Sequence, residues 1–274
     1  MPPYNPLVSV IMPVYKSDEY LEDAIVSIIN QTFRDFEFII VCDDPTDRSK
    51  AIISRYQMND DRIKVVYQKH EGLVAALNKG CSLARGKYIA RMDADDISLS
   101  ERFEKQVAFM EAHPGCSLVG TFVEWINESG QFLGYWSIDI TTKTAAEIRN
   151  TLPQENCIAH PSVVIRRSVF NDYHYDHLQK NAEDYDLWLR MASDNHLLCK
   201  LPEFLLKLRI HHSSVMSTRK REAPGSDKIH CKIRYLNKKL CAGKISFFDL
   251  SVFFYLLINL GIWPIRRIQL KLDG

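Results

Sequence analysis

The sequence predicts an α/β protein built on a mostly parallel, Rossmann-like sheet flanked by helices. Short apolar runs alternate with amphipathic segments over about the first 125 residues, a pattern typical of repeated βα units. The runs at residues 7–12 and 36–42 are almost continuously apolar, as expected for strands covered on both faces. Aspartates directly follow two of the runs. Because such sheets bind ligands beyond the carboxyl ends of their strands, we expect the functional site at that edge.

The first predicted helix lies between these two strands. Leu21, Ile25, Ile28 and Ile29 recur at helical spacing, and Ser17 is expected to cap the helix. The alternation continues with predicted strands at residues 63–67, 87–92 and 118–125 and predicted helices at residues 73–83 and 101–112. A later helix is expected at residues 184–192, in a stretch of shorter runs that would complete a pocket.

Charge divides the chain of 274 residues into an acidic body and a basic tail. The net charge is only +1, which argues against a nucleic-acid binder. Residues 207–274 nevertheless carry 14 Lys and Arg against 4 Asp and Glu, whereas residues 1–206 carry 21 against 30. The seven cysteines are widely spaced without a CxxC pair, which predicts reduced thiols. No signal peptide is evident, so we expect a cytoplasmic protein.

Carboxylates cluster after two of the predicted strands. Asp43 and Asp44 follow the second strand, and Asp93, Asp95 and Asp96 follow the strand at residues 87–92. Such clusters repel unless a cation joins them, and Mg²⁺ and Mn²⁺ prefer oxygen ligands, often shared with substrate phosphates. The Asp-x-Asp motif is therefore a candidate metal site for a diphosphate. The alternative is that these aspartates serve only turns and helix caps.

A third acidic cluster lies downstream, where the sequence predicts a helix. Glu183 and Asp184 would be favoured in the first turn of that helix by its dipole alone. The functional alternative is that a carboxylate here faces a bound substrate and takes a proton from an attacking hydroxyl.

Together these motifs resemble the inverting family 2 glycosyltransferases with the GT-A fold. The similarity runs in order from residue 8 to about residue 217. It covers the opening strand (VSVIMPVY, 8–15), the end of the first helix (SIINQTF, 27–33), the uridine-binding turn (VCDDPTD, 41–47), the metal motif (ARMDADD, 90–96) and the segment of the catalytic base (AEDYDLW, 182–188).

The resemblance implies a role for each motif. Pro13, Tyr15 and Asp44 would line the nucleoside site, with Asp44 accepting a hydrogen bond from the uracil ring. Asp93 would contact the ribose, and Asp95 would be the principal ligand of Mn²⁺ or Mg²⁺. Such an enzyme would be of the hexosyltransferase type and would take a nucleotide-sugar, with a UDP-sugar as the expected donor.

Other positions follow from the same resemblance. Asp184 would be the catalytic base of a direct, inverting displacement. His211, in an Arg-x-His segment, would reach the diphosphate or the metal, although it could equally be a core or surface histidine. Asn78 would make a weaker contact with the nucleotide-sugar donor. Pro45 stands where the family usually has Gly, which leaves the base preference open because Pro fixes a backbone angle that Gly leaves free.

The resemblance also implies a division of the chain into three parts. Residues 1–126 would form the nucleotide-sugar-binding half and residues 127–217 the acceptor-side half of one catalytic domain. Residues 218–274 would form a basic helical tail, a C-terminal extension of the GT-A fold. The acceptor would be a saccharide, free or carried on a polyprenyl diphosphate, as in the assembly of bacterial surface polysaccharides.

The tail has the pattern of an amphipathic helix. Ile229, Ile233, Leu236 and Leu240 form one stripe, with lysines 228, 232, 238 and 239 available for the polar side. The apolar segment that follows is too short to span a bilayer. We therefore expect residues 228–271 to contact an anionic membrane surface, which would make the protein peripheral on the inner face of the cell membrane. The alternative is that these helices pack on the body or form a homodimer.

Two other functions are compatible with parts of the sequence. Asp93 and Asp95 could serve a metal-dependent phosphohydrolase, although such enzymes normally carry this motif on their first strand. The fold could also belong to a catalytically inactive membrane-bound scaffold. A nicotinamide dehydrogenase is disfavoured because residues 13–17 (PVYKS) replace the Gly-rich phosphate turn.

Overall fold

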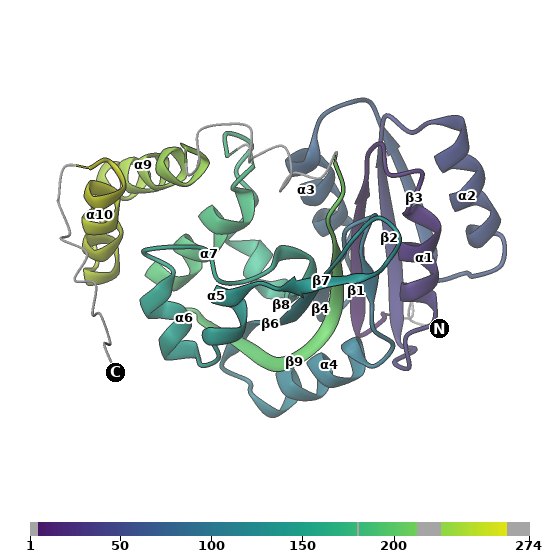
Figure 1. Cartoon of the computed structure of the whole chain (residues 1–274), viewed down its shortest axis with the longest axis horizontal. Helices are drawn as coiled ribbons and strands as arrows, with labels where there is room; N and C mark the ends of the chain where they lie inside the picture. The colour runs from purple at the N-terminus through teal and green to yellow at the C-terminus, as the bar shows by residue number, and fades with distance from the viewer. Residues whose placement is uncertain (1–4, 180, 213–225, 262–274) are drawn as a thin grey trace, which may run out of the picture.

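A single twisted sheet forms the centre of the protein (Figure 1). The computed structural model describes residues 5–179, 181–212 and 226–261. The strands are β1 (Val8–Val14), β2 (Phe36–Asp43), β3 (Ile63–Gln68), β4 (Tyr88–Arg91), β5 (Ile97–Ser98), β6 (Cys116–Ile126), β7 (Phe132–Tyr135), β8 (Val164–Arg166) and β9 (Leu197–Arg209). Their order is β3-β2-β1-β4-β8-β6-β9-β5, with β7 paired to β6.

The sheet combines a parallel half with a mixed half. Strands β3, β2, β1 and β4 all run parallel, as do β6 and β9. Strand β8 is antiparallel to β4 and β6, and β5 is antiparallel to β9. The predicted α/β fold with a largely parallel sheet is therefore confirmed. The carboxyl ends of β1, β2 and β4 lie at one edge, which places the aspartates that follow β2 and β4 at the same edge of the sheet.

The helices lie on both faces of this sheet and beyond it. They are α1 (Leu21–Ile29), α2 (Asp47–Gln57), α3 (Leu73–Leu83), α4 (Arg102–Ala112), α5 (Ser137–Thr141), α6 (Ala145–Thr151), α7 (Glu183–Ser193), α9 (Ser226–Cys241) and α10 (Phe247–Asn259). Two short 3₁₀ turns, η1 (His160–Ser162) and η2 (Arg167–Asn171), flank β8.

Two features of the first βα units differ from the prediction. Helix α1 begins at Leu21 rather than after Ser17, whose hydroxyl instead donates to the Tyr15 carbonyl at 3.0 Å. Helix α2 was not predicted because its outer surface is polar. Its cap is nevertheless encoded in the sequence, since the Thr46 hydroxyl accepts a hydrogen bond from the Ser49 N–H at 3.0 Å.

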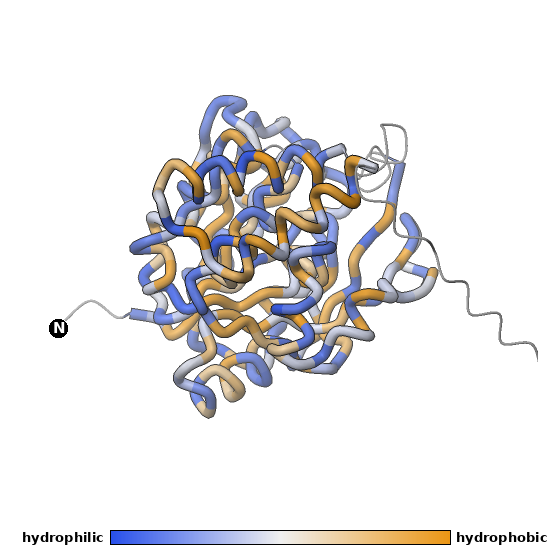
Figure 2. The backbone as a smooth tube through the Cα atoms, turned by 90° about the vertical axis from the view of Figure 1, so that its left-hand side faces the viewer, coloured by the Kyte–Doolittle hydropathy of each residue, from blue (hydrophilic) through white to orange (hydrophobic). Residues whose placement is uncertain are grey.

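Helices α9 and α10 form the C-terminal extension and pack on the body beside α7 (Figures 1 and 2). Ile229, Ile233 and Leu236 of the predicted stripe pack against the core, but Leu240 is 63% exposed. The prediction that the lysines of this helix form its polar side is also only partly right. Lys232 is fully buried, and its ammonium donates to the Gln154 carbonyl at 3.0 Å. Among the described residues, no helix is both long and apolar enough to cross a membrane.

Apolar side chains fill the space on both faces of the sheet. On β1, Val8, Val10 and Met12 face the side covered by α1 and α4, whereas Ile11 faces α3. This alternation follows from the two-residue period of a strand. A strand that buries both faces favours apolar residues at every position, which explains why its sequence is almost continuously apolar. The exception on β1 is buried Ser9, whose hydroxyl donates to Glu37 of β2 at 2.7 Å.

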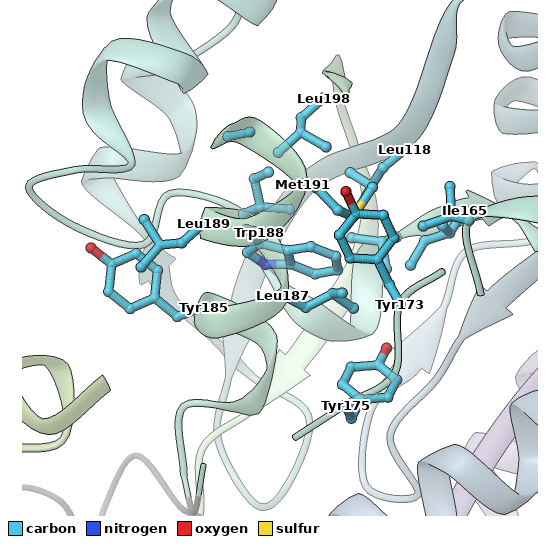
Figure 3. Packing of buried hydrophobic residues seen from close by; sticks show 14 of the residues in the cluster. Leu118, Ile165, Tyr173, Tyr175, Tyr185, Leu187, Trp188, Leu189, Met191 and Leu198 are labelled. Carbon is cyan, nitrogen blue, oxygen red and sulfur yellow. The ribbon is translucent and has the colours of Figure 1, made fainter. Parts of the chain in front are cut away.

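Helix α7 is anchored in the core by Trp188 (Figure 3). This indole is fully buried, and Tyr173, Tyr175, Leu118 and Ile165 belong to the same cluster. Burial of so large an apolar side chain stabilises the helix in one position. The first turn of α7, which carries the third acidic cluster, is therefore held rigidly relative to the sheet.

Candidate active site

The Asp-x-Asp-Asp motif after β4 forms a compact acidic cluster. Carboxylate oxygens of Asp93, Asp95 and Asp96 all lie within 4.8 Å of one another. Asp96 is 2% exposed, and its Oδ2 has no hydrogen-bond partner among the described residues. Burial, followed by the charges of Asp95 and Asp93, raises the pKa of Asp96 well above its usual value. This donor set fits a hard divalent cation such as Mg²⁺ or Mn²⁺, which would relieve the repulsion.

Arg209, at the end of β9, holds both a carboxylate and the backbone of this cluster in place. Its N–H donates to Asp96 Oδ1 at 2.8 Å, and its Nε donates to the Asp95 carbonyl at 2.9 Å. Its Nη1 also donates to the Glu128 carbonyl at 2.8 Å. Because the Arg209 side chain is buried and bonded to backbone groups on two sides, it supports the loop that carries the carboxylates.

His211 follows two residues later and reaches the same cluster. Its Nε2 lies 2.9 Å from Asp95 Oδ2, and its ring packs against Tyr20 with 5.1 Å between the centroids. The sequence left open whether this histidine is near the metal site or is merely structural. The structure places it directly beside Asp95, the predicted principal ligand.

A buried arginine pair supports the cluster from inside the sheet. Arg91 forms an ion pair with Asp93, and its carbonyl accepts from Arg102 Nη2 at 2.8 Å. Burial, followed by the charge of Arg91, lowers the pKa of Arg102 to about 9. Sequence reasoning missed both residues. The available signal was a charged residue inside the apolar run of β4, which a buried strand tolerates only when that charge is paired.

A cavity of about 310 Å³ lies at the carboxyl ends of β1 and β2. Pro13 and Tyr15, both predicted for the nucleoside site, line it together with Asp43 and His70. The rings of Tyr15 and His70 stack with 4.5 Å between their centroids and 19° between their planes. His70 was not predicted, because it lies in the loop after β3, and proximity to Tyr15 arises only when β1, β2 and β3 pair.

The two aspartates at the end of β2 have different surroundings. Asp43 is buried and accepts hydrogen bonds from the Glu71 and Gly72 N–H groups at 2.8 and 2.9 Å. Although burial acts in the opposite direction, these bonds and one from Gln68 lower the pKa of Asp43. Asp44 is exposed and adopts a φ of 56°, a left-handed conformation that Asp tolerates. Asp44 is not among the residues that line the cavity.

A second cavity, of about 360 Å³, joins the acidic cluster to the third acidic motif. Asp93 and Asp184 both line it, although they lie far apart in the sequence. Its wall also includes Trp125, Trp136 and Lys228. Leu73 lines both this cavity and the one beside Tyr15, so the two are neighbours.

Asp184 is oriented by two hydrogen bonds. Asn156 Nδ2 donates to Asp184 Oδ2 at 2.9 Å, and the Tyr185 N–H donates to Asp184 Oδ1 at 2.7 Å. The carboxylate is half-buried at the start of α7. Asn156 was missed from the sequence because nothing local connects it to a residue so far downstream.

A buried histidine lies beside Asp184 in the wall of the same cavity. His160 Nε2 is 2.9 Å from the Tyr175 hydroxyl, and His160 Nδ1 is 3.6 Å from Glu183 Oε1. Burial, followed by the nearby charge of Arg91, lowers the pKa of His160 to about 3, so its ring is neutral at physiological pH. Asn78 supports the same region, since its side-chain amide bonds both backbone groups of Tyr175 at 2.9 and 3.0 Å. A contact between Asn78 and the nucleotide-sugar stays a prediction.

Sequence comparison identifies the family to which this arrangement belongs. Residues 9–174 match the profile of Glycosyl transferase family 2. The chain is a family 2 glycosyltransferase. The resemblance predicted from its motifs is therefore confirmed, and this membership favours glycosyl transfer over the phosphohydrolase alternative.

Several similar glycosyltransferases cover three quarters or more of the chain. One from Methanocaldococcus jannaschii is 36% identical over 93% of this chain and 87% of its own length. The O-antigen biosynthesis glycosyltransferase WbnJ of Escherichia coli is 36% identical over 77% of this chain and 83% of its own. The amylovoran biosynthesis glycosyltransferase AmsE of Erwinia amylovora is 31% identical over 95% of this chain and 96% of its own.

Solved structures agree with the fold of this glycosyltransferase. TarS of S. aureus in complex with UDP-GlcNAc superposes with a TM-score of 0.69, at 19% identity over 92% of this chain and 71% of that one. The mannosyltransferase PcManGT of Pyrobaculum calidifontis, in complex with GDP-Man and Mn²⁺, gives a TM-score of 0.64 at 15% identity over 96% of this chain and 78% of that one. The glycosyltransferase thus has the predicted GT-A fold.

Proposed function

We propose that this glycosyltransferase moves a sugar from a UDP-sugar to a hydroxyl of a saccharide acceptor, with inversion at the anomeric carbon. The observation that carries the proposal is the cavity shared by Asp93 and Asp184. A carboxylate of the acidic cluster lies at one part of its wall and a hydrogen-bonded carboxylate at another. Such a cavity can hold a sugar between a diphosphate and an acceptor.

The donor would bind across the two neighbouring cavities. The stacked Tyr15 and His70 rings offer an aromatic wall for a base. Asp44 directly follows Asp43, which lines this cavity. The diphosphate would lie at Asp95 and His211. A uridine nucleotide is the preferred candidate because the similar fold of TarS binds UDP-GlcNAc.

Bound at Asp95 and its neighbours, Mn²⁺ or Mg²⁺ would neutralise the diphosphate and stabilise it as a leaving group. Asp184 would accept the proton of the acceptor hydroxyl. The resulting oxygen would form a bond to the anomeric carbon while the bond from that carbon to the diphosphate oxygen breaks, which releases the nucleoside diphosphate. Asn156 and the Tyr185 N–H would keep the Asp184 carboxylate turned toward the hydroxyl.

The acceptor would bind against the aromatic side of the second cavity. Trp125 and Trp136 are half-buried in its wall, and Trp125 Nε1 is buried without a hydrogen-bond partner among the described residues. An indole presents an apolar face to a sugar ring and one N–H donor to a hydroxyl. The relatives named for O-antigen and amylovoran biosynthesis support a polysaccharide or lipid-linked saccharide as acceptor.

In this proposal each of the three parts of the chain has the role that the sequence predicts for it. Residues 1–126 would bind the donor, and residues 127–217 would supply Asp184 and the acceptor wall. Residues 218–274 would bring the enzyme to the inner face of the cell membrane. Lys228 of α9 lines the acceptor cavity and pairs with Glu155, so the tail also borders the site.

The test compares two variants that each remove one carboxylate charge. Asp184→Asn should lower turnover of a UDP-sugar by roughly a hundred-fold or more, because it removes the proton acceptor and preserves the shape. Affinity for the UDP-sugar, measured calorimetrically with Mn²⁺ present, should stay nearly unchanged. Asp61→Asn alters an exposed residue before β3 and should behave as wild type.

Normal turnover by Asp184→Asn would disprove its role as base. If the wild-type enzyme consumes no member of a panel of UDP-sugars in the presence of Mn²⁺ and a saccharide acceptor, the proposed donor class is wrong. Binding of a UDP-sugar without any turnover would support the inactive scaffold instead.

A further inference from the structure

Helix α10 is apolar on two opposite faces. Phe248, Val252 and Leu256 are buried against the body. Phe247 and Leu250 are 89% and 52% exposed, and Phe253 is similarly exposed. At about 100° per residue, these two sets fall on opposite sides of the helix.

The exposed face of α10 carries no charge. Asp249 is the only ionisable acidic or basic residue between Phe247 and Asn259, and it is buried. Its carboxylate accepts hydrogen bonds from the Tyr235 hydroxyl and the Ser246 N–H. An ordinary surface helix has a charged or polar outer face, so this face is adapted to an apolar environment. Figure 2 views the molecule from the side on which α9 and α10 lie.

Helix α9 fixes the position of this face. Lys239 pairs with Asp194 at 2.7 Å, and Lys238 pairs with Asp176 at 2.5 Å. Together with buried Lys232, these side chains bind α9 to the body and are not directed to an external partner. These three lysines thus fix α9 on the body, and α10 packs on α9 with its apolar outer face exposed.

The charge around the exposed face indicates what covers it. Lys244 is exposed in the turn before α10, next to exposed Ile245. The sequence after α10 adds Trp263 and three basic residues within residues 262–274, with one acidic residue. Aromatic and basic residues close in sequence to an apolar helix are typical of segments that lie at the interface of an anionic bilayer. A second copy of the chain would instead bring like charges together.

We propose that Ile245, Phe247, Leu250 and Phe253, flanked by Lys244, form the surface with which the protein lies on an anionic lipid bilayer. This differs from a membrane contact along the lysines of α9, which are engaged by the body. Because α9 also contributes Lys228 to the acceptor cavity, the bilayer surface and the cavity belong to one rigid unit. Membrane attachment is part of the proposed function, and this surface specifies its residues. Presentation of a lipid-linked acceptor to that cavity also rests on the proposed transfer reaction, whereas binding to the bilayer does not depend on that reaction.

The test is flotation of the full chain with two kinds of vesicle. Vesicles of phosphatidylcholine with about one third phosphatidylglycerol should bind the protein, and vesicles of phosphatidylcholine alone should bind it far less. Phe247→Ser/Phe253→Ser should reduce the bound fraction at least roughly ten-fold, because both side chains leave the inserted face. Met58→Ser/Tyr67→Ser also removes two exposed apolar side chains, which lie at α2 and β3, and should float as wild type.

Each outcome decides the proposal. Failure of the wild-type protein to float with anionic vesicles, or equal flotation of the α10 variant, would overturn it. A concentration-dependent dimer in sedimentation that Phe247→Ser/Phe253→Ser abolishes would show that a second copy covers the face. UDP-sugar hydrolysis without vesicles should be unchanged in this variant, so loss of membrane binding and failure of the proposed activity are distinguishable.

Discussion

In the candidate site, most side chains hold the position of a neighbouring side chain or backbone group. Asp95 and Asp96 are exposed to different degrees, yet Arg209 bonds both, the backbone carbonyl of Asp95 and the side-chain carboxylate of Asp96. Arg91 holds the third carboxylate of the cluster, Asp93. A group of like charges at such short range persists only with surrounding donors or a cation, so the residues behind the cluster matter as much as the cluster itself.

The adjacent histidines allow a matched test at this scale. His211→Ala removes a ring nitrogen 2.9 Å from Asp95 Oδ2, whereas His212→Ala removes an exposed ring that pairs with surface Glu128. We expect His211→Ala to raise the Mn²⁺ concentration required for half-maximal activity by roughly ten-fold or more. His212→Ala should leave it unchanged. A titration in which both variants behave alike would assign His211 a purely structural role.

Helices and strands determine where those side chains point. Helix α7 is anchored by Trp188 and by α9 and α10, and it carries Asp184 in its first turn. Strand β9 supplies Arg209 at its end and buried Lys200 near its start, where Lys200 pairs with Asp139 at 2.8 Å. Because each element is fixed at several points, the part of the site around Asp184 is preformed.

The contact between α9 and α10 predicts a measurable contribution to stability. Tyr235→Phe removes a buried hydroxyl that donates to Asp249, and leaves that carboxylate with fewer donors. We expect a loss of about 1–3 kcal/mol in the free energy of unfolding, measured by urea titration at neutral pH. Tyr67→Phe, which alters an exposed tyrosine, should cost almost nothing. A value for Tyr235→Phe near that of Tyr67→Phe would mean that the helix pair opens independently of the body.

Across the whole molecule, one buried carboxylate joins several elements at the edge of the sheet opposite the site. Glu37 of β2 accepts from Ser9 of β1 at 2.7 Å, from Lys64 of β3 at 2.7 Å, and from the Arg85 N–H before β4 at 2.8 Å. Although burial acts in the opposite direction, these bonds lower the pKa of Glu37 to about 2. The parallel half of the sheet is thus linked at its amino-terminal edge by charge as well as by backbone pairing.

This link predicts how stability depends on pH. Since the pKa of Glu37 is lower in the folded than in the unfolded protein, its contribution is present above pH 4.5 and is lost as the pH falls toward about 2. Glu37→Gln should therefore destabilise the protein at pH 7 by about 3 kcal/mol, and the difference from wild type should shrink between pH 5 and pH 3. Urea titrations at the three pH values test this, and a difference independent of pH would contradict it.

Local patterns account for much of the fold and for the chemistry of the site. The strands at β1 and β2, helix α3 and the acidic motifs are predicted from the sequence because each depends on residues that are close along the chain. The same holds for family membership, which rests on short collinear motifs. The start of α1 was predicted incorrectly because capping depends on how the preceding turn folds. Helix α2 was missed because its outer surface is polar, although its cap is encoded in the sequence.

The sequence alone therefore determined the kind of sheet, the edge that carries the carboxylates and the family of the enzyme. Tertiary structure alone decided that His70 stacks on Tyr15, that Asn156 orients Asp184, and that the lysines of α9 bind the body while α10 presents an uncharged apolar face. The reason is physical: each of these contacts joins residues distant in the chain, and whether a side chain is buried or paired depends on what the fold places opposite it.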